Sequence, residues 1–158
     1  RRFEPACKAA CEALSASKLV PSADAALLRR SLDTSTARAR FGTALADLLY
    51  GRQAPESRVE RFGSALDAIG ARRWSLATFF GFVRSPDQHA LLRPGETPLA
   101  AAALRVDIAF RPVVNADTYA RLLALMRALG REIAELEPAD GFDVYAFLRA
   151  IAGDASLA

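Results

Sequence analysis

The apolar residues between positions 115 and 137 are spaced so that they share one face only if this stretch is a helix. Its apolar residues recur every three or four positions: Tyr119, Leu122, Leu123, Met126, Leu129, Ile133 and Leu136. Asn115 precedes the stripe as a helix cap, and Pro138 follows it as a stop. The stretch therefore predicts one long helix.

Composition extends the helical prediction to the whole chain. The 158 residues include 34 Ala and 21 Leu, whereas Val, Ile and Thr together number 17. Ala and Leu favour helices, and β-branched residues favour strands. Leu, Ile, Val and Phe sum to 41 residues, enough for a core without a disulfide or a metal. We expect an all-α fold, a single compact multi-helix domain over residues 1–158.

Proline, glycine and capping residues divide this domain into about eight helices. We expect them at about residues 4–18, 22–32, 35–50, 55–69, 75–83, 97–104, 116–137 and 141–152. Ser22 and Asp140 are the expected caps of the second and last helices, and Gly51 is expected to end the third in a left-handed conformation. The fifth helix is apolar nearly all round, which predicts a buried central helix. Residues 106–114 alternate and contain Pro112, so we expect one short extended segment there.

The cysteines and the hydropathy pattern bear on localisation. Cys7 and Cys11 are one helical turn apart, a spacing that favours two free thiols and a reducing, cytoplasmic compartment. No apolar run approaches the roughly 18 residues that span a bilayer, so we expect no contact with a membrane. The chain begins with Arg1 and Arg2, without an initiator methionine, and we expect it to be part of a longer protein.

Few catalytic or metal sites are compatible with this sequence. A metal site needs three or four converging ligands, and the chain has a single histidine, His89. The nine glycines are scattered, so no phosphate-binding loop is present, and no Gly-x-Ser-x-Gly elbow occurs. We therefore expect no metal and no cofactor. An enzyme would have to depend on His89 with Asp87, two residues earlier in the same loop.

Arginines in the middle of the chain raise a second hypothesis, nucleic-acid binding. Residues 72–111 hold six basic and three acidic side chains, whereas residues 112–158 hold four and seven. The six basic residues fall at expected helix ends and loops, with Trp74 and His89 among them: Arg72, Arg73, Arg84, Arg93, Arg105 and Arg111. Arginine can bind phosphates while an aromatic ring stacks on a base of DNA or RNA. Alternatively, Arg72 and Arg73 cap a helix and Trp74 belongs to the core.

Residues 74–152 also carry a series of short motifs in a recognisable order. These are Trp74-Ser-Leu-Ala-Thr-Phe-Phe-Gly-Phe, Ser85-Pro-Asp-Gln-His89, Arg93-Pro-Gly-Glu-Thr97, Ile108-Ala-Phe-Arg-Pro112, Thr118-Tyr119 and Asp140-Gly-Phe-Asp-Val-Tyr-Ala-Phe147. Their order resembles an uncharacterised helical module of bacterial proteins, some of them linked to restriction or phage-defence machinery. The chain departs from that module at Arg149, where a bulky aromatic residue is expected.

The resemblance implies a bacterial accessory module and two interpretations of its motifs. If the motifs form a site, Asp87, His89, Arg93 and Tyr119 are the residues to test. If they fix loops, Pro86, Pro94 and Thr97 matter only for folding.

We expect a non-catalytic helical interaction module that binds a protein partner or the remainder of its own longer chain. Its first alternative is a DNA-binding domain using the central arginines, and its second is an enzyme using His89 and Asp87.

Overall fold

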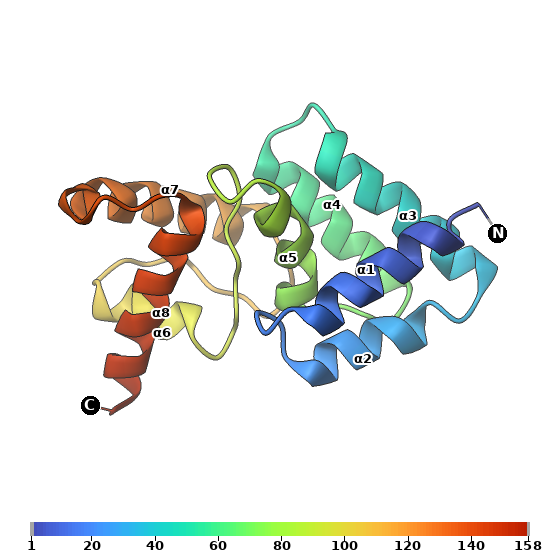
Figure 1. Cartoon of the computed structure of the whole chain (residues 1–158), viewed down its shortest axis with the longest axis horizontal. Coiled ribbons are helices and arrows are strands. Elements are labelled where there is room, and N and C mark those ends of the chain that lie inside the picture. The colour runs from blue at the N-terminus through green and yellow to red at the C-terminus, as the bar shows by residue number, and fades with distance from the viewer. Residues whose placement is uncertain (1, 158) are drawn as a thin grey trace.

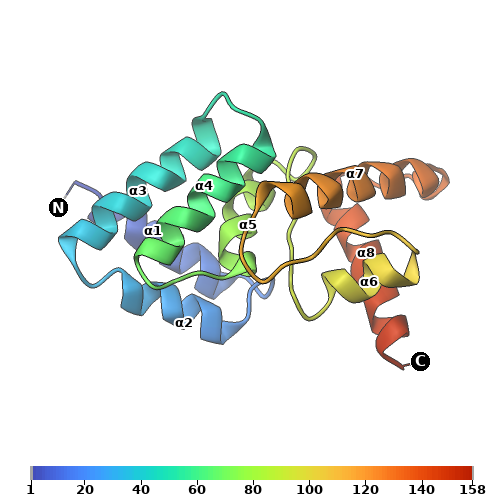
Figure 2. The same ribbon diagram turned by 180° about the vertical axis from the view of Figure 1, so that it is seen from behind.

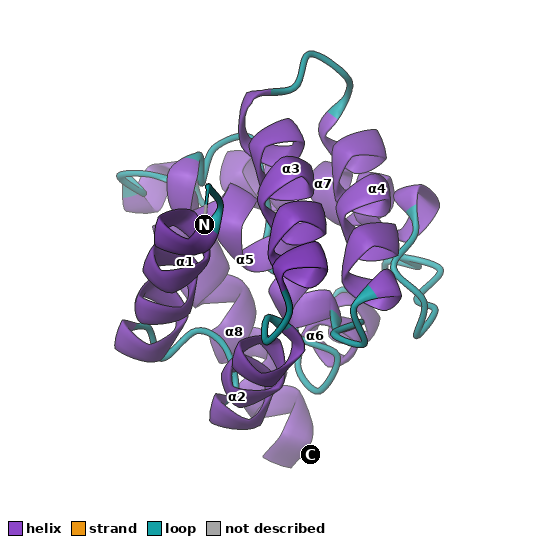
Figure 3. Cartoon of the chain, turned by 90° about the vertical axis from the view of Figure 1, so that its right-hand side faces the viewer, coloured by secondary structure: helices purple, strands orange, loops and turns teal. Residues whose placement is uncertain are grey.

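The computed structural model describes residues 2–157, and helices joined by loops make up the described chain (Figures 1 and 3). Its eight α-helices are α1 (Glu4–Ala16), α2 (Ser22–Ser31), α3 (Ser35–Tyr50), α4 (Pro55–Ala68), α5 (Trp74–Arg84), α6 (Thr97–Ala103), α7 (Ala116–Glu132) and α8 (Gly141–Leu157). One 3₁₀ helix, η1 (Ala134–Leu136), follows α7. Residues 2–157 contain no strand. The prediction of a compact all-α fold with about eight helices is confirmed.

Helix α5 lies in the middle of the molecule (Figures 1 and 2). Helices α1 to α4 pack on one side of it, and α6, α7 and α8 lie on the other. Every residue of α5 from Trp74 to Phe82 is buried, which confirms the predicted central helix. Phe80 of α5 meets Phe41 of α3 and Phe62 of α4 in an aromatic cluster with ring centroids 5.8–6.1 Å apart. This cluster joins the central helix to the first group of helices.

Two of the predicted helix caps are correct. The Asn115 side chain accepts a hydrogen bond from the backbone N–H of Thr118 at 2.8 Å. The Asp140 side chain accepts one from the backbone N–H of Phe142 at 2.9 Å. Each cap satisfies a donor that the first helical turn leaves without a backbone partner.

Three predicted helix ends are wrong. Ser22 is the first residue of α2 rather than its cap, because Pro21 occupies the capping position with no side-chain hydrogen bond. Gly51 has a φ of −63°, so it leaves α3 in an extended rather than a left-handed conformation. Helix α8 does not end before Gly153, as predicted. It continues through this exposed glycine to Leu157.

The segment 106–114 has no strand partner within residues 2–157 and is an irregular loop. The Trp74 indole N–H donates to the Arg111 carbonyl at 2.7 Å, and the Thr118 hydroxyl donates to the Ala109 carbonyl at 2.7 Å. Ala109 itself has a φ of 48°, which breaks the extended conformation. Hydrogen bonds from side chains therefore hold this segment in place, whereas a strand would be held by backbone hydrogen bonds to a neighbouring strand.

No helix of residues 2–157 combines the length and the apolar character that crossing a bilayer requires.

Candidate functional site

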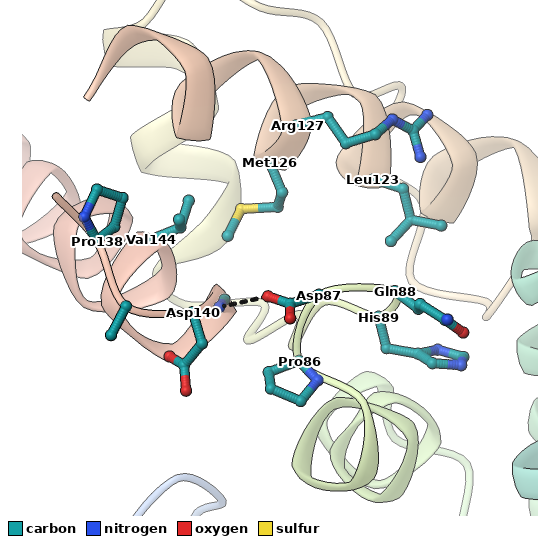
Figure 4. A pocket seen from close by; sticks show the side chains of 12 residues that line it. Pro86, Asp87, Gln88, His89, Leu123, Met126, Arg127, Pro138, Asp140 and Val144 are labelled. Atoms are coloured by element: carbon teal, nitrogen blue, oxygen red, sulfur yellow. Dashed lines mark hydrogen bonds between the residues drawn. The ribbon is translucent and has the colours of Figure 1, made fainter. Parts of the chain in front are cut away.

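A pocket of about 270 Å³ opens where the loop after α5 meets α7 and the start of α8 (Figure 4). We call it the α7–α8 pocket, and it is lined by Pro86, Asp87, Gln88, His89, Leu123, Met126, Arg127, Pro138, Ala139, Asp140, Gly141 and Val144. Its apolar part comes from α7 and α8, with Leu123 and Val144 buried and Met126 half-buried. The pocket therefore combines an apolar wall with a polar rim.

The loop of this pocket is folded by its own backbone. Helix α5 ends at Arg84 because Ser85 precedes a proline, which disfavours the helical conformation. The Ser85 carbonyl accepts hydrogen bonds from the N–H groups of Gln88 and His89, both at 3.0 Å. A single backbone turn thus occupies residues 85–89.

Contacts with the start of α8 then fix the loop in place. The Asp87 carboxylate accepts a hydrogen bond from the Gly141 N–H at 3.0 Å (Figure 4). A Cβ atom at residue 141 would overlap the Pro86 carbonyl, so only glycine permits this approach. Two motifs that lie far apart in the sequence, at residues 85–89 and 140–147, are therefore in contact and line one pocket together.

Asp140 and Asp87 give the pocket rim two carboxylates, and Arg127 gives it one guanidinium. Asp140 uses one oxygen to cap α8, and the neighbouring Asp143 accepts from the Ala139 N–H at 2.7 Å. Both sides of the rim are therefore held by hydrogen bonds. Two negative charges against one positive charge favour a cationic group at the mouth of the pocket.

His89 is 6% exposed and packs directly on the backbone of α5. A Cβ atom at Gly81 would stand 2.8 Å from the Nδ1 atom of His89, so glycine makes room for the ring. That Nδ1 atom is hydrogen-bonded to the Tyr119 hydroxyl at 2.9 Å. Burial, with a smaller contribution from the positive charge of Arg58, lowers the pKa of His89 to about 4. The ring is neutral at pH 7.

This geometry does not favour a catalytic pair of His89 and Asp87. Asp87 binds the Gly141 N–H, whereas the hydrogen bond of the His89 ring in the described chain goes to Tyr119. A base with a pKa near 4 takes up few protons at pH 7. Tyr119 also accepts from the Ala90 N–H at 3.0 Å, so the His89–Tyr119 pair fastens the loop to α7.

Two threonines fasten the rest of the same loop. Thr78 accepts from the Leu92 N–H at 3.0 Å, and Thr97 accepts from the Arg93 N–H at 2.9 Å. Together with Asp87, His89 and Tyr119, these contacts give several of the recurring motif residues a loop-fixing role.

The structure does not gather the six central arginines into one patch. Arg73 and Arg84 stand at opposite ends of α5, whose 11 residues separate them by about 16 Å. Three others make local pairs: Arg72 with Asp67 at 3.9 Å, Arg93 with Glu96 at 3.5 Å, and Arg111 with the Asn115 side chain at 2.8 Å. Arg105 is exposed after α6.

Trp74 and Arg73 are also engaged within the fold. Trp74 is 2% exposed, so its indole presents no face on which a base could stack. Arg73 lies 3.4 Å from the carboxylate of Asp24. The tryptophan belongs to the core, which was the alternative interpretation of its sequence position.

Arg84 lies over an aromatic ring that sequence reasoning missed. Its guanidinium carbon is 4.4 Å from the ring centroid of Tyr50, which is 67% exposed. Arg58 holds the loop after Tyr50 by donating to the carbonyls of Leu48 at 2.5 Å and Gln53 at 2.9 Å. Tyr50 lies outside the apolar stripe of its helix. That position in the sequence could have indicated that its ring is exposed.

Cys7 is buried and Cys11 half-buried, and both are free thiols. Burial raises the pKa of each thiol above its ordinary value. Within residues 2–157, no three side chains of His, Cys, Asp or Glu are grouped as metal ligands would be.

The α7–α8 pocket is thus the place where the structure unites residues that the sequence analysis singled out separately. Asp87 and His89 line it from the loop after α5, and Asp140 lines it from the start of α8. Comparisons of the chain with protein-family models, with curated proteins and with solved structures found no match.

Proposed function

We propose that this chain is a non-catalytic helical interaction module of a larger bacterial cytoplasmic protein, and that it binds a protein partner through the α7–α8 pocket. The observation that carries the proposal is the pocket itself, with its apolar wall and charged rim. Its 270 Å³ lie below the roughly 300–1,000 Å³ typical of small-molecule sites. A single anchoring side chain in a well-formed pocket is a common centre of a protein interface. The bacterial origin and a link to defence systems rest on the resemblance over residues 74–152.

The lining of the pocket defines the chemistry of its partner. Leu123, Met126 and Val144 offer contact to one apolar side chain, and methionine adapts readily to different shapes. Asp87 and Asp140 on the rim favour a lysine or arginine beside that apolar anchor. The partner segment therefore presents an apolar residue next to a basic one.

Selection from a library of random peptides displayed on phage tests this function. The purified chain is expected to enrich peptides that share an apolar residue adjacent to lysine or arginine. Ala139 is exposed at the pocket rim, so Ala139→Trp blocks the pocket without changing the core. Ala124→Trp is the matched control, because Ala124 is exposed on α7 and does not line the pocket.

The proposal requires that the enriched peptides bind the Ala124→Trp variant and do not bind the Ala139→Trp variant. Peptides that bind both variants equally, or a library with no enriched sequence, would contradict it.

A second candidate function, binding of single-stranded nucleic acid, is favoured by the Tyr50–Arg84 pair. An exposed aromatic ring beside an exposed arginine is the combination that stacks a base and contacts its phosphate. Arg52 is exposed on the same short loop, in which the Gln53 carbonyl accepts a hydrogen bond from Arg58. This pair, rather than Arg72, Arg73 and Trp74, is where we place a nucleic-acid contact.

Binding of short labelled DNA and RNA at about 50 and 200 mM salt tests the second candidate. Affinity is expected to fall with salt, and to fall further in Tyr50→Ala and Arg84→Ala. The double variant Arg72→Ala/Arg73→Ala should bind as well as the unmodified chain. Equal loss in the double variant, or no binding at the lower salt concentration, would exclude this contact.

A further inference from the structure

A second cavity, of about 410 Å³, lies between α1, the end of α2 and the start of α3. Figures 1 and 3 show α1 packed beside these two helices. Both cysteines of the chain, Cys7 and Cys11, line this cavity. It shares no lining residue with the α7–α8 pocket and is independent of the proposed function.

The two thiols lie on the same side of α1. Cys7 and Cys11 are one helical turn apart, which places their Cβ atoms about 5–6 Å from each other. Cys7 is 4% exposed, and its thiol donates a weak hydrogen bond to the Arg38 carbonyl of α3 at 3.7 Å. Burial raises the pKa of the Cys7 thiol and the neighbouring Cys11 raises it further, so the two sulfur atoms lie within electrostatic reach of each other. The helix thus holds a pair of free thiols at one wall of the cavity.

A pair of thiols without a third ligand selects one class of metal ion. Zn²⁺ needs three or four protein ligands, and no three side chains within residues 2–157 are grouped to supply them. Thiolates are soft ligands, and they favour Cu(I) among the ions of the first transition row. Two thiolates in a nearly linear arrangement complete the coordination of Cu(I). The expectation of no metal concerned sites of three or four ligands, and a two-ligand ion falls outside it.

Cationic side chains lie beside both thiols. A Cu(I) ion held by two thiolates forms a complex with one net negative charge. Burial raises the pKa of each thiol, and the positive charges of Arg38 at Cys7 and of Arg29 at Cys11 oppose this rise. Arg29 is held in place, because its guanidinium donates to the Ser15 hydroxyl at 2.8 Å. These two positive charges favour the anionic complex over the empty pair of neutral thiols.

The outer part of the cavity gives the metal an entry path, which every metal site requires. Glu4, Lys8 and Glu12 line this part and are exposed. Lys8 and Glu12 form an ion pair at 3.9 Å in which both side chains are exposed, and such a pair contributes little to stability. These side chains therefore move aside at little cost when an ion enters.

We propose that Cys7 and Cys11 bind one Cu(I) ion between them. Each thiol gives its proton to solvent as its Cu–S bond forms, so two protons leave for each ion bound and the ion keeps its oxidation state. Arg29 and Arg38 balance the charge of the complex.

Competition for Cu(I) with the chelator bathocuproine disulfonate, under anaerobic conditions, tests the proposal on the full chain. Cys11→Ser is the main variant, since Cys11 is only half-buried. The double variant Cys11→Ser/Ala13→Cys is the matched control, because it keeps two thiols but moves the second to an exposed position off the face of Cys7. Circular dichroism of each variant measures whether its helix content is retained.

The unmodified chain is expected to bind one Cu(I) per chain. Affinity is expected to fall at least about 100-fold in both variants, because loss of a contact that only orients a metal ligand already costs roughly 10–100-fold. Three results overturn the proposal. These are equal affinity of the unmodified chain and Cys11→Ser, equal affinity of the unmodified chain and the double variant, and a complex in which one Cu(I) joins two chains.

Discussion

The carboxylate of Asp87 accepts a hydrogen bond from the backbone N–H of Gly141, 3.0 Å away and 54 residues further along the chain. This bond joins the loop after α5 to the start of α8, two adjoining segments that both line the α7–α8 pocket. Gly141 can come this close because it has no Cβ to meet the Pro86 carbonyl. The shape of the pocket therefore depends on a few polar contacts made by the loop residues themselves.

Replacing Asp87 by alanine should loosen this junction. The variant Asp87→Ala leaves the Gly141 N–H without its acceptor, and we expect a loss of about 1 kcal/mol in the free energy of unfolding. Urea denaturation measures this change. Asp154→Ala is the control, because it removes an exposed carboxylate of α8. It should leave the free energy of unfolding within about 0.5 kcal/mol of that of the unmodified chain. Equal effects of the two substitutions would mean that the Asp87 bond contributes nothing.

Gly141 and Gly153 provide a matched pair within α8. Gly141→Ala forces a Cβ onto the Pro86 carbonyl, and we expect destabilisation of about 1–3 kcal/mol. Gly153→Ala meets nothing within 4 Å and removes a glycine from a helix interior, so it should stabilise by about 0.5–1 kcal/mol. Thermal unfolding of both variants compares the two effects. Changes of the same sign would refute the close approach at Gly141.

The Tyr119 hydroxyl should contribute substantially to the free energy of unfolding. Tyr119→Phe removes the partner of the His89 ring and leaves the buried N–H of Ala90 unpaired. We expect a cost of about 1–3 kcal/mol in unfolding free energy. Tyr50→Phe is the control, since Tyr50 is 67% exposed and its ring is retained. A Tyr119→Phe variant as stable as this control would show that the loop does not depend on the hydroxyl.

His89 should make stability depend on pH in a defined direction. Its pKa is lowered from 6.5 to about 4 in the folded chain, so between these values the unfolded chain binds the proton and the folded chain does not. Stability therefore falls as pH drops from 6.5 towards 4, with this group contributing about 1.4 kcal/mol per pH unit, and the contribution levels off below 4. NMR titration of this single histidine measures its pKa directly. A value near 6.5 in the folded chain would contradict its burial.

Local sequence signals were sufficient to predict most of the helices. The Asn115 and Asp140 caps, the stripe of α7 and the apolar α5 each depend on residues a few positions apart. Ser22 failed as a cap because α2 begins one residue earlier than its capping preference indicates: the Pro21 carbonyl accepts the first helical hydrogen bonds, from the N–H groups of Asp24 and Ala25. Gly51 failed because α3 leaves its last turn in an extended conformation, and the following loop is held there by Arg58, ten residues after Leu48.

The pocket was only partly predictable from the sequence. Asp87 and His89 were recognised as candidates, but their partners, Gly141 and Tyr119, lie 54 and 30 residues away. The spacing of residues did not indicate that the Asp87 carboxylate binds the start of α8 instead of the His89 ring. The central arginines show the same limit, because the sequence placed them at helix ends and loops without indicating which of them share a face, and α5 holds Arg73 and Arg84 at its opposite ends.

The affinity of one selected peptide for three forms of the chain tests the central claim most directly. Fluorescence anisotropy would give the Kd of the unmodified chain, of Ala139→Trp and of Ala124→Trp. If the α7–α8 pocket receives an apolar anchor, Ala139→Trp weakens binding at least about tenfold while Ala124→Trp stays within about twofold. Equal affinities of all three forms would contradict the assignment of this pocket as the binding site.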